Sequence, residues 1–430
     1  MRAGVVYRGT MRILVVGSGG REHALAWKIS RSPLCDSLHC APGNPGMAGL
    51  ATLVPIRADD VEGIVRHVRD AGIDLVVIGP EAPLVAGLAD RIADERVPVF
   101  GPSAAAAEIE GSKAFAKEVM VAAGIPTADY GLFEDPAPAL AWAQERGGRV
   151  VVKADGLAAN KDVVVAGSLD EAEQAIRSML VDRIHGAAGA RILVEERLEG
   201  REASCIAFTD GERARMLPAA QDHKRVGDGD TGPNTGGMGA YSPSPAVTPD
   251  LMREVEDTVM LPALREMARR GRPFRGALYA GLMLTRAGIR VLEFNARLGD
   301  PETQPLLMRL RGDLVPILLA AAHGDLSGVQ VDVDPRAAIG IVLAADGYPG
   351  AVVTGDVIEG ADQDLGPDVQ VFHAGTARRE DGALVASGGR VLTVCALGAG
   401  IPAARDRAYA AIERIRLRGG HYRRDIGVGT

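Results

Sequence analysis

Two side chains near the end of an apolar run have the chemistry of metal ligands. Glu293 and Asn295 are two residues apart in Val291-Leu-Glu-Phe-Asn295, where apolar and polar residues alternate. On a β-strand this spacing places both side chains on one face. A carboxylate and an amide oxygen are hard ligands that suit magnesium bridging ATP phosphates, whereas either residue alone would indicate only a solvated strand end. Arg297 continues along the same face if the strand does, and its guanidinium suits a carboxylate or a phosphate.

Two lysines lie where a phosphate would be a suitable partner. Lys153 ends the apolar run Arg149-Val-Val-Val-Lys153. An ammonium group there is costly unless it meets an anion, so we expect it to bind phosphate. Lys113 lies in Glu110-Gly-Ser-Lys-Ala-Phe115 near a predicted helix, where the pattern alone leaves a phosphate site and an ordinary surface position equally open.

An acidic run follows the apolar segment Ile192-Leu-Val194. Its carboxylates, on Glu195, Glu196 and Glu202, can accept hydrogen bonds from the adenine and ribose of a nucleotide. Taken alone, a charged run of this kind is more typical of a solvated turn.

A glycine-rich turn, Gly17-Ser-Gly-Gly-Arg-Glu22, lies between an apolar run and a predicted helix. Such a turn leaves backbone N–H groups free to hold an anion at the helix N-terminus. The dinucleotide fingerprint requires glycine at the sixth position, where this chain has Glu22, so the match to a nicotinamide-binding loop is weak. We expect phosphate binding of another kind, with a tight structural turn as the alternative.

A long polar, glycine-rich segment at 221–247 interrupts an otherwise compact pattern. Loops of this length without regular structure are usually functional or disordered. This segment carries Asp222, His223, Lys224 and Arg225 in succession. That concentration of charge favours a functional loop.

The elements that position these residues begin with strands that alternate with helices, which predicts a parallel, doubly wound α/β sheet. Its expected strands are 12–17, 73–78 and 97–100, with helices at 18–31, 83–96 and 103–123. A hairpin follows, with strands at 149–153 and 163–166, and then a helix at 169–183 and a strand at 191–195. Antiparallel strands are expected at 201–220, a helix at 248–270, and strands at 276–285 and 289–295. A strand at 337–344, a hairpin around 384–397 and a helix at 401–415 predict a separate C-terminal α+β domain.

The composition narrows the class of protein. The chain has 430 residues, 47% of them hydrophobic, and a formal net charge of -8, which predicts a soluble protein without a nucleic-acid or membrane partner. No apolar stretch is long enough to span a bilayer. Four scattered cysteines without a CxxC pair indicate neither a zinc site nor disulfides, so we expect a cytoplasmic protein with reduced thiols.

The chain resembles the ATP-grasp superfamily in the order of its elements: a lysine, a loop lysine, a Glu-Glu hinge, a long central loop and Glu-x-Asn. Its finer motifs resemble the phosphoribosylamine–glycine ligases, over nearly the whole chain from Met11 to about Gly427. These motifs are Gly19-Gly-Arg-Glu-His-Ala24, Ala41-Pro-Gly-Asn44, Gly79-Pro-Glu-Ala-Pro-Leu-Val85, Lys153-Ala-Asp-Gly-Leu157, Gln221 to Tyr241 and Glu293 to Gln304. The resemblance implies ATP-dependent ligation of glycine to 5-phosphoribosylamine through glycyl phosphate, a step of de novo purine biosynthesis.

The resemblance also implies roles for particular residues. ATP is expected at Lys113, Lys153, Lys161, Glu195, Glu196, Leu198 and Glu202, and Mg²⁺ or Mn²⁺ at Glu293 and Asn295. Asp222 and Arg297 are candidates for the glycine end, and Arg297, Asp222 and Lys224 for catalysis. Gly17, Gly19, Gly20, Asn44 and Glu81 are candidates for the phosphoribosyl end.

We expect four segments and a monomer whose partners are small molecules. The segments are an N-terminal extension at 1–10, an N-terminal α/β domain at 11–112, an ATP-grasp domain at 113–330 with a lid at about 125–198, and a C-terminal α+β domain at 331–430.

Three other functions stay open at this point. They are another ATP-grasp ligase, such as a carboxylase subunit of purine synthesis, a nicotinamide-dependent dehydrogenase, and a non-catalytic ATP-binding relative.

One departure from the family pattern generates a prediction. The family usually has Ala-Gly-Lys-Gly where this chain has Ala159-Asn-Lys-Asp162, in a loop expected to close over the ATP phosphates. The Asp162 carboxylate should repel those phosphates and compete for Lys161, and a penalty of roughly 1 kcal/mol weakens ATP binding about fivefold. We therefore expect Asp162→Gly, with or without Asn160→Gly, to lower the Michaelis constant for ATP. Steady-state kinetics across a range of salt concentrations test this, and a constant unchanged or raised in both variants would show that the departure is neutral.

Overall fold

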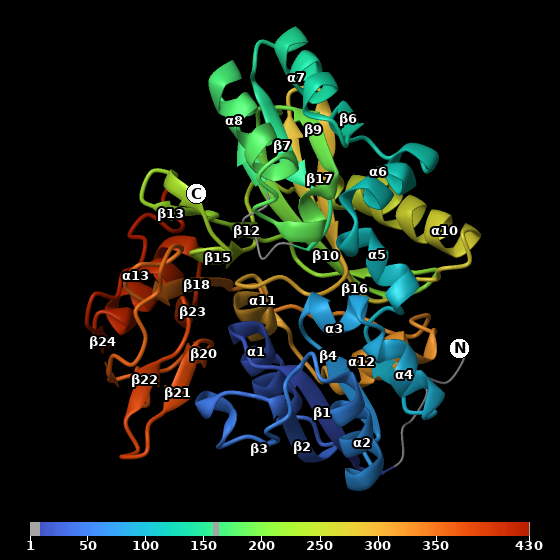
Figure 1. Cartoon of the computed structure of the whole chain (residues 1–430). Helices are drawn as coiled ribbons and strands as arrows, with labels where there is room; N and C mark the ends of the chain where they lie inside the picture. Colours follow the sequence, from blue (N-terminus) through green and yellow to red (C-terminus); the bar gives the residue numbers. More distant parts are fainter. Residues whose placement is uncertain (1–8, 158–162, 430) are drawn as a thin grey trace.

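The computed structural model describes residues 9–157 and 163–429, so Asn160, Lys161, Asp162 and most of the expected N-terminal extension lie outside the described residues. Figure 1 shows the N-terminal part of the chain at the bottom, a lid at the top and the C-terminal part at the left. No helix in the described part of the chain is long and apolar enough to cross a membrane.

The N-terminal sheet is parallel throughout and has the order β3-β2-β1-β4-β5, which confirms the predicted doubly wound α/β domain. Its elements are β1 (Met11–Gly17), α1 (Gly20–Ile29), β2 (Cys35–Pro42), β3 (Thr52–Leu53), α2 (Val61–Ala71), β4 (Leu75–Ile78), α3 (Glu81–Val85), α4 (Leu88–Asp94) and β5 (Val99–Phe100). The expected helix 83–96 is two helices, because Gly87 between α3 and α4 has φ +85°.

The expected helix 103–123 is also two helices, α5 (Ala104–Gly111) and α6 (Lys113–Ala122). Ser112 between them is extended, and its hydroxyl oxygen accepts a hydrogen bond from the Phe115 amide at 3.1 Å. Ser112 therefore caps α6 and fixes where Lys113 begins that helix.

One face of the parallel sheet is covered by α12 (Val315–His323), a helix from far along the chain. Val15 and Val77 of the sheet share a buried cluster with Leu318 of α12 and Phe208 of a second, antiparallel sheet. The sequence of α12 is apolar almost all round, as expected for a helix buried between two layers. The N-terminal domain, predicted to end at residue 112, therefore shares one hydrophobic core with later segments of the chain.

The lid is a four-stranded sheet with the order β6-β9-β7-β8, covered by two helices and drawn at the top of Figure 1. Its elements are β6 (Tyr130–Phe133), α7 (Pro136–Glu145), β7 (Val150–Ala154), β8 (Val163–Val165), α8 (Leu169–Leu180) and β9 (Ile192–Glu196). The predicted hairpin is confirmed, with β7 and β8 antiparallel. The buried hydrophobic cluster of the lid contains only residues between 139 and 194, so this part has a core of its own.

The second sheet is antiparallel, with the order β11-β10-β16-β17, which confirms the antiparallel strands predicted within 201–220. Its strands are β10 (Arg201–Asp210), β11 (Ala214–Met216), β16 (Arg275–Thr285) and β17 (Gly288–Asn295). The helices α9 (Pro249–Val255) and α10 (Leu261–Arg269) lie between β11 and β16 in the chain, and α11 (Thr303–Arg309) packs against α1 and the C-terminal strand β18 (Ala337–Ala344). The expected helix 248–270 is α9 and α10 joined by a wider π-helical turn at 256–260.

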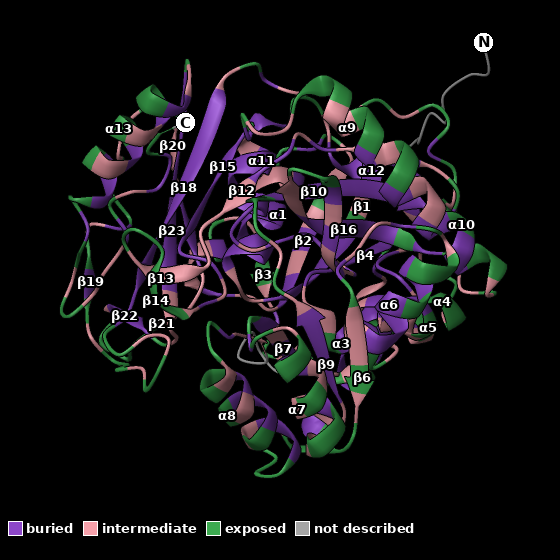
Figure 2. Cartoon of the chain, turned by 90° about the horizontal axis from the view of Figure 1, so that it is seen from above, coloured by how far each residue is buried: buried purple, intermediate pink, exposed green. Residues whose placement is uncertain are grey.

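The C-terminal sheet has the order β12-β15-β18-β23-β20 and includes two strands from the central segment. Its strands are β12 (Gln221–Asp222), β15 (Gly239–Ser242), β18 (Ala337–Ala344), β20 (Val369–His373) and β23 (Arg390–Gly398), beside α13 (Ile401–Ile412). Between β12 and β15, β13 (Arg225–Gly227) and β14 (Thr231–Asn234) form a hairpin. The expectation that 221–247 lacks regular structure is therefore wrong. Buried β18, purple in Figure 2, requires a hydrogen-bonding partner on this side, and β15 supplies it.

The prediction of a hairpin around 384–397 is also wrong. β22 (Leu384–Ala386) pairs with β21 (Thr376–Arg378), while β23 pairs with β18 and β20. The nine-residue β23 finds partners along its length in these longer strands, which the three-residue β22 cannot provide. The short strands β19 (Ile358–Glu359) and β24 (Arg416–Leu417) pair with each other at the edge of the domain.

Two buried histidines join the N-terminal and C-terminal parts. The His373 amide on β20 donates a hydrogen bond of 2.8 Å to Nδ1 of His23 on α1. Burial, together with His373, lowers the pKa of His23 to about 3, and burial lowers the pKa of His373 to about 4. Asn44 donates to the carbonyl oxygen of the same His373 at 2.8 Å, which ties a third segment to this junction.

This junction predicts acid sensitivity. Both histidines stay neutral in the folded protein, whereas an unfolded imidazole takes up a proton below about pH 6.5. The free energy of unfolding should therefore fall as pH falls from about 6.5 toward 4, by about 1.4 kcal/mol per pH unit for each imidazole. His23→Asn keeps an acceptor without the titration and should lose less stability over this window in urea unfolding at stepped pH. The exposed His323→Asn should keep the wild-type dependence, and equal slopes in all three proteins would contradict the assignment.

Candidate active site

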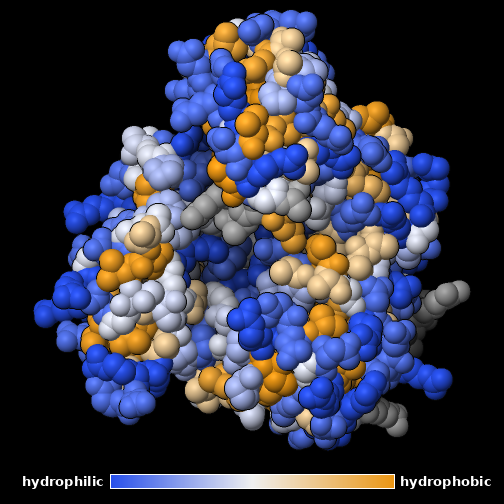
Figure 3. All heavy atoms as spheres, in the orientation of Figure 1, coloured by the Kyte–Doolittle hydropathy of each residue, from blue (hydrophilic) through white to orange (hydrophobic). Residues whose placement is uncertain are grey.

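A cavity of about 760 Å³ lies where the lid, the central sheet and the C-terminal part meet, and it is lined by charged side chains from all of them. Figure 3 shows a hollow, largely hydrophilic, between the lid and the rest of the molecule. The predicted site residues that line it are Glu81, Lys113, Lys153, Glu195, Glu196, Leu198, Glu202, Asp222, Lys224, Glu293, Asn295 and Arg297. Predicted residues that do not line it are Gly17, Gly19, Gly20 and Asn44.

The predicted metal pair lies at the end of β17. Glu293 is opposite Gly281 and Asn295 is opposite Tyr279 on β16. The predicted clean alternation is wrong at Leu292, because a register shift between Gly281 and Leu282 makes Leu292 an extra residue on β17. Lys153 donates a hydrogen bond to the carbonyl oxygen of Leu292 at 3.0 Å.

Glu293 is ionised and has a cationic neighbour. Its Oε1 lies 3.4 Å from Nζ of Lys224, and Lys224 more than any other group lowers the pKa of Glu293 to about 2. Among the described residues, no group of three or more histidine, cysteine, aspartate or glutamate side chains forms a complete metal site. Magnesium prefers six oxygen ligands, so Glu293 and Asn295 fit a cation shared with the phosphates of a bound nucleotide rather than a protein-only site.

Arg297 does not continue along the strand face, because β17 ends at Asn295. Its guanidinium lies between two carboxylates, with Nη2 at 2.8 Å from Glu110 and Nε at 3.3 Å from Glu81. Glu110 also accepts a hydrogen bond of 2.7 Å from the Ala296 amide. Burial raises the pKa of Glu110 to about 7 although Arg297 opposes the shift. Glu110 and Glu81 therefore fix the orientation of an arginine that still lines the cavity.

Glu195 lies between two lysines rather than facing open space. Its carboxylate is 2.9 Å from Nζ of Lys153 and 3.2 Å from Nζ of Lys117. All three groups are buried beneath the lid side of the cavity. Glu196, the next residue, accepts a hydrogen bond of 3.1 Å from the Asp129 amide and is half-buried.

Asp222 and Glu302 form an anionic corner. Burial, followed by the charge of Glu302, raises the pKa of Asp222 well above its usual range. Oδ1 of Asp222 makes no hydrogen bond to any described residue. Glu302 accepts hydrogen bonds from the hydroxyls of Tyr279 at 2.9 Å and Ser204 at 3.0 Å. This corner has an acceptor oxygen without a hydrogen bond and two carboxyl groups that repel each other, and an ammonium group would satisfy both.

The glycine-rich turn before α1 is closed by its own glutamate. The Gly19 amide donates a hydrogen bond of 2.7 Å to Glu22, and a Cβ on Gly17 would lie 2.5 Å from Cγ of Glu22. Glu22 thus occupies the position expected for a bound anion. Asn44 is buried and bonded to the carbonyl oxygens of Ser18 and His373 and to the Gly46 amide.

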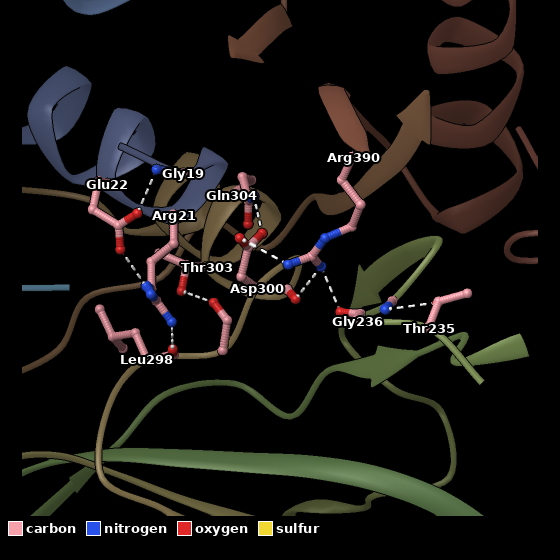
Figure 4. A network of polar contacts seen from close by, with 12 residues as sticks. Gly19, Arg21, Glu22, Thr235, Gly236, Leu298, Asp300, Thr303, Gln304 and Arg390 are labelled. Atoms are coloured by element: carbon pink, nitrogen blue, oxygen red, sulfur yellow. Dashed lines mark hydrogen bonds and ion pairs between the residues drawn. The ribbon is translucent and has the colours of Figure 1, made fainter. Parts of the chain in front are cut away.

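Figure 4 shows the polar network that lies beside this turn. Arg390, on β23, donates to the carbonyl oxygens of Asp300 and Gly236 and pairs with the Asp300 carboxylate at 3.3 Å. Asp300 in turn accepts a hydrogen bond of 2.6 Å from Gln304. Arg21 and Asp300 line the cavity, and Arg21 donates a hydrogen bond to Glu22 of the glycine turn.

Comparison with known proteins decides the family. The family models for phosphoribosylglycinamide synthetase match over residues 11–110 (N domain), 111–303 (ATP-grasp (A) domain) and 338–429 (C domain). The phosphoribosylamine–glycine ligase of Caulobacter vibrioides is 54% identical over 421 residues, which is 97% of this chain and 98% of the relative. The chain belongs to the phosphoribosylamine–glycine ligase family.

A crystal structure from this family agrees over almost all of the chain. The phosphoribosylamine–glycine ligase of Thermotoga maritima has a TM-score of 0.83 and 33% identity, and the match covers 96% of this chain and all of that one, 100%. Membership of the phosphoribosylamine–glycine ligases confirms the predicted ATP-grasp fold and the ATP-dependent carbon–nitrogen ligase class in purine biosynthesis. It excludes the dehydrogenase interpretation of the N-terminal turn.

The ATP-grasp fold is shared more widely than the chemistry. The biotin carboxylase domain of 2-oxoglutarate carboxylase from Hydrogenobacter thermophilus, solved with MgADP and bicarbonate, has a TM-score of 0.76 at 18% identity, with 97% of this chain and 92% of that one covered. At this identity the similarity shows the fold alone. What separates phosphoribosylamine–glycine ligases from such relatives must lie in the side chains of the cavity.

Several charged residues of the cavity were not predicted from the sequence. Glu110, Lys117, Glu302 and Arg390 all line the cavity. Glu110 and Glu302 lie inside motifs that were recognised for their neighbours, so a test of every charged residue in those motifs would have found them. Arg390 had no signal, because only the pairing of β23 with β18 brings it to the site.

Proposed function

We propose that this cavity is the place where ATP, glycine and 5-phosphoribosylamine react to give glycinamide ribonucleotide, ADP and phosphate. The observation that carries the proposal is the separation of charge within one cavity. Lys153 of the lid and Lys113, which donates to the Gly156 carbonyl oxygen, act on Glu293 of the metal pair. Asp222 and Glu302 form the acidic corner, and Lys224 interacts with both Glu293 and Asp222. This arrangement suits an anionic polyphosphate at one end and a zwitterionic amino acid at the other.

The nucleotide end is formed by the lid and β17. Lys113, Lys153 and Lys224 supply positive charge for the phosphates, and Glu196, Leu198 and Glu202 line the region for adenine and ribose. Lys161, predicted for the same end, lies outside the described residues. Because the Glu195 carboxylate forms ion pairs with two ammonium groups, we assign it to holding those lysines rather than to contacting adenine.

Glu293 and Asn295 would hold the magnesium, or manganese, of the nucleotide complex. When bound, the cation neutralises phosphate charge. Lys224 keeps Glu293 ionised in the absence of the nucleotide, which prepares the carboxylate for a cation. The ion pair at 3.4 Å is long, so Lys224 can move toward phosphate without losing a close partner.

The glycine end is formed by groups of opposite charge. Arg297, braced by Glu110 and Glu81, can offer its remaining N–H groups to the glycine carboxylate. Asp222 and Glu302 can accept hydrogen bonds from the glycine ammonium, and the added positive charge relieves their mutual repulsion. Such two-point binding would aim the carboxylate at the phosphate end.

Most of the residues predicted for the phosphoribosyl end do not line the cavity. Of the five predicted residues, Glu81 lines the cavity directly. We propose that Gly17, Gly19, Gly20 and Asn44 shape the turn that presents Arg21, because Glu22 closes that turn and Asn44 is fully engaged. Phosphate could reach the turn only by displacing the Glu22 carboxylate.

The chemistry follows from activation of a carboxylate. A glycine oxygen attacks the γ-phosphorus and ADP leaves, which gives glycyl phosphate. The amine of phosphoribosylamine then attacks the carbonyl carbon, loses a proton, and expels phosphate. The side chains of this chain position the reactants and stabilise negative charge, and the lid keeps water from the acyl phosphate.

We further propose that the working parts of the chain are those expected from sequence: an extension at 1–10, an α/β domain at 11–112, an ATP-grasp domain at 113–330 with its lid at about 125–198, and a C-terminal domain at 331–430. The separate cores of the lid and of the C-terminal sheet support two of these divisions. The monomeric state and the cytoplasmic location stay predictions.

The proposed reaction predicts a strict substrate requirement. ADP should be released at a substantial rate only when glycine and phosphoribosylamine are both present with ATP and magnesium. A coupled ADP assay with each substrate omitted in turn measures this. Bicarbonate in place of glycine serves as the matched carboxylase control, and equal turnover with bicarbonate would refute the proposal.

The metal assignment predicts a specific loss. Glu293→Ala removes the only charged ligand of the pair, so turnover should fall by at least about 100-fold while the far-ultraviolet circular dichroism is kept. Residual activity should require more magnesium than the wild type. Glu359 is an exposed glutamate on β19, and Glu359→Gln is the control. It should leave the turnover and the magnesium requirement unchanged. A Glu293→Ala enzyme with near wild-type turnover at low magnesium would place the metal elsewhere.

A further inference from the structure

Lysine is rare in this chain, and its positions are informative. The sequence contains 6 lysines against 42 arginines. Four of the lysines, at 113, 117, 153 and 224, line the cavity, and Lys161 lies outside the described residues. Arginine meets almost every other need for positive charge, so the clustered lysines mark positions that require a compact ammonium group. Lys117 is the lysine of this cluster to which the proposed function gives no role.

Lys117 is buried at the junction of the lid and the central sheet. Its side chain is 2% exposed, and the side chains of Glu195 and Lys153 are 3% and 8% exposed. The Glu195 carboxylate is shared, with Oε1 at 3.2 Å from Lys117 and Oε2 at 2.9 Å from Lys153. Lys117 also donates a hydrogen bond of 2.6 Å to Thr127, whose hydroxyl donates to the Val291 carbonyl oxygen at 2.7 Å.

The sharing of the Glu195 carboxylate determines the net charge of this cluster. One carboxylate between two ammonium groups leaves a net charge of about +1 in a region where little water is present to screen it. Without Lys117, Glu195 and Lys153 would form a neutral pair, and Lys153 would have little positive charge to offer the cavity. We propose that Lys117 is a positioning residue that occupies half of the Glu195 carboxylate and so keeps Lys153 available for the polyphosphate of the nucleotide. This inference rests on the proposed function only in taking the cavity to bind ATP.

The proton of Lys117 should be sensitive to alkaline pH. Burial lowers the pKa of Lys117 to about 8, although Glu195 opposes the shift and Lys153 reinforces it. The groups that face it are Glu195 and Glu196 from β9, Lys153 from β7 and the Tyr130 ring from β6, at 5.2 Å. Because a neutral Lys117 no longer balances Glu195, nucleotide affinity should weaken between about pH 7 and 9 in the wild type.

The test is a charge-balance experiment on equilibrium binding of ADP and ATP with magnesium, measured by titration calorimetry on the whole chain. Lys117→Met preserves the shape of the side chain and removes its charge, and should weaken binding about tenfold. Lys117→Met/Glu195→Gln restores the net charge to about +1 and should recover affinity to within about threefold of the wild type. The alkaline loss of affinity should be absent from Lys117→Met.

Two controls separate charge from packing. Thr127→Val breaks the hydrogen bond to Lys117 without altering any charge, and should change nucleotide affinity by less than about twofold. Lys28 lies outside the cavity lining and donates to the Leu310 carbonyl oxygen. Lys28→Met should also change nucleotide affinity by less than about twofold. Thermal unfolding confirms that each variant is folded.

The proposal would be overturned by a folded Lys117→Met that binds nucleotide as tightly as the wild type, or by a double variant weaker than Lys117→Met, since purely structural losses accumulate. Binding is measured without glycine or phosphoribosylamine. A failure of the ligation reaction would therefore leave this result intact, and the two proposals can fail separately.

Discussion

The cost of taking charge out of water governs the construction of this cavity. Charged groups from several elements are buried there, and each must be paired, shared or matched by a ligand. Arg297 is held by Glu81 and Glu110, Lys153 by Glu195, and Glu293 by Lys224. The exception is the corner of Asp222 and Glu302, where like charges meet. Lys224 and Arg390 act on Asp222 from nearby, and in the proposed function the ammonium group of glycine adds a further positive charge at this corner.

The fold supplies these pairs by bringing distant segments to one point. Strands β12 and β15 join the C-terminal sheet, so Asp222 and Lys224 lie on a segment anchored to that domain although they precede it by a hundred residues or so. Arg390 strengthens the same attachment by binding the Gly236 carbonyl oxygen on one side and Asp300 on the other, as drawn in Figure 4. In the proposed arrangement, Asp222 of the glycine end is therefore positioned by the C-terminal sheet, while the lid and β17 position the nucleotide end. Their relative placement sets the distance between the two reacting groups.

The sequence predicted local chemistry better than spatial partnership. Glu293 and Asn295 were found because a period of two residues is a property of the strand itself. Lys153 was expected to meet an anion, and it does, but the structure supplies Glu195 from β9 as that anion. Arg297 could not be placed, because the end of β17 and the carboxylates of Glu81 and Glu110 are set by tertiary packing. Glu22 was recognised as a break in a fingerprint, yet its folding back onto the Gly19 amide depends on side-chain conformation that spacing does not specify.

The buried lysines of the nucleotide end lie at the crossings between the lid and the body of the molecule. The chain enters the lid near Thr127 and leaves it after Glu196, and both crossings touch the buried lysines. Thr127 pairs with Val291 just before the metal ligands, and Lys153 reaches the Leu292 carbonyl oxygen from inside the lid. A rotation of the lid about these crossings would move Lys153 relative to Glu293 while Lys117, on α6 of the body, stays in place. Lys117 of the body and Lys153 of the lid therefore meet at the single carboxylate of Glu195, where the chain crosses between the two parts.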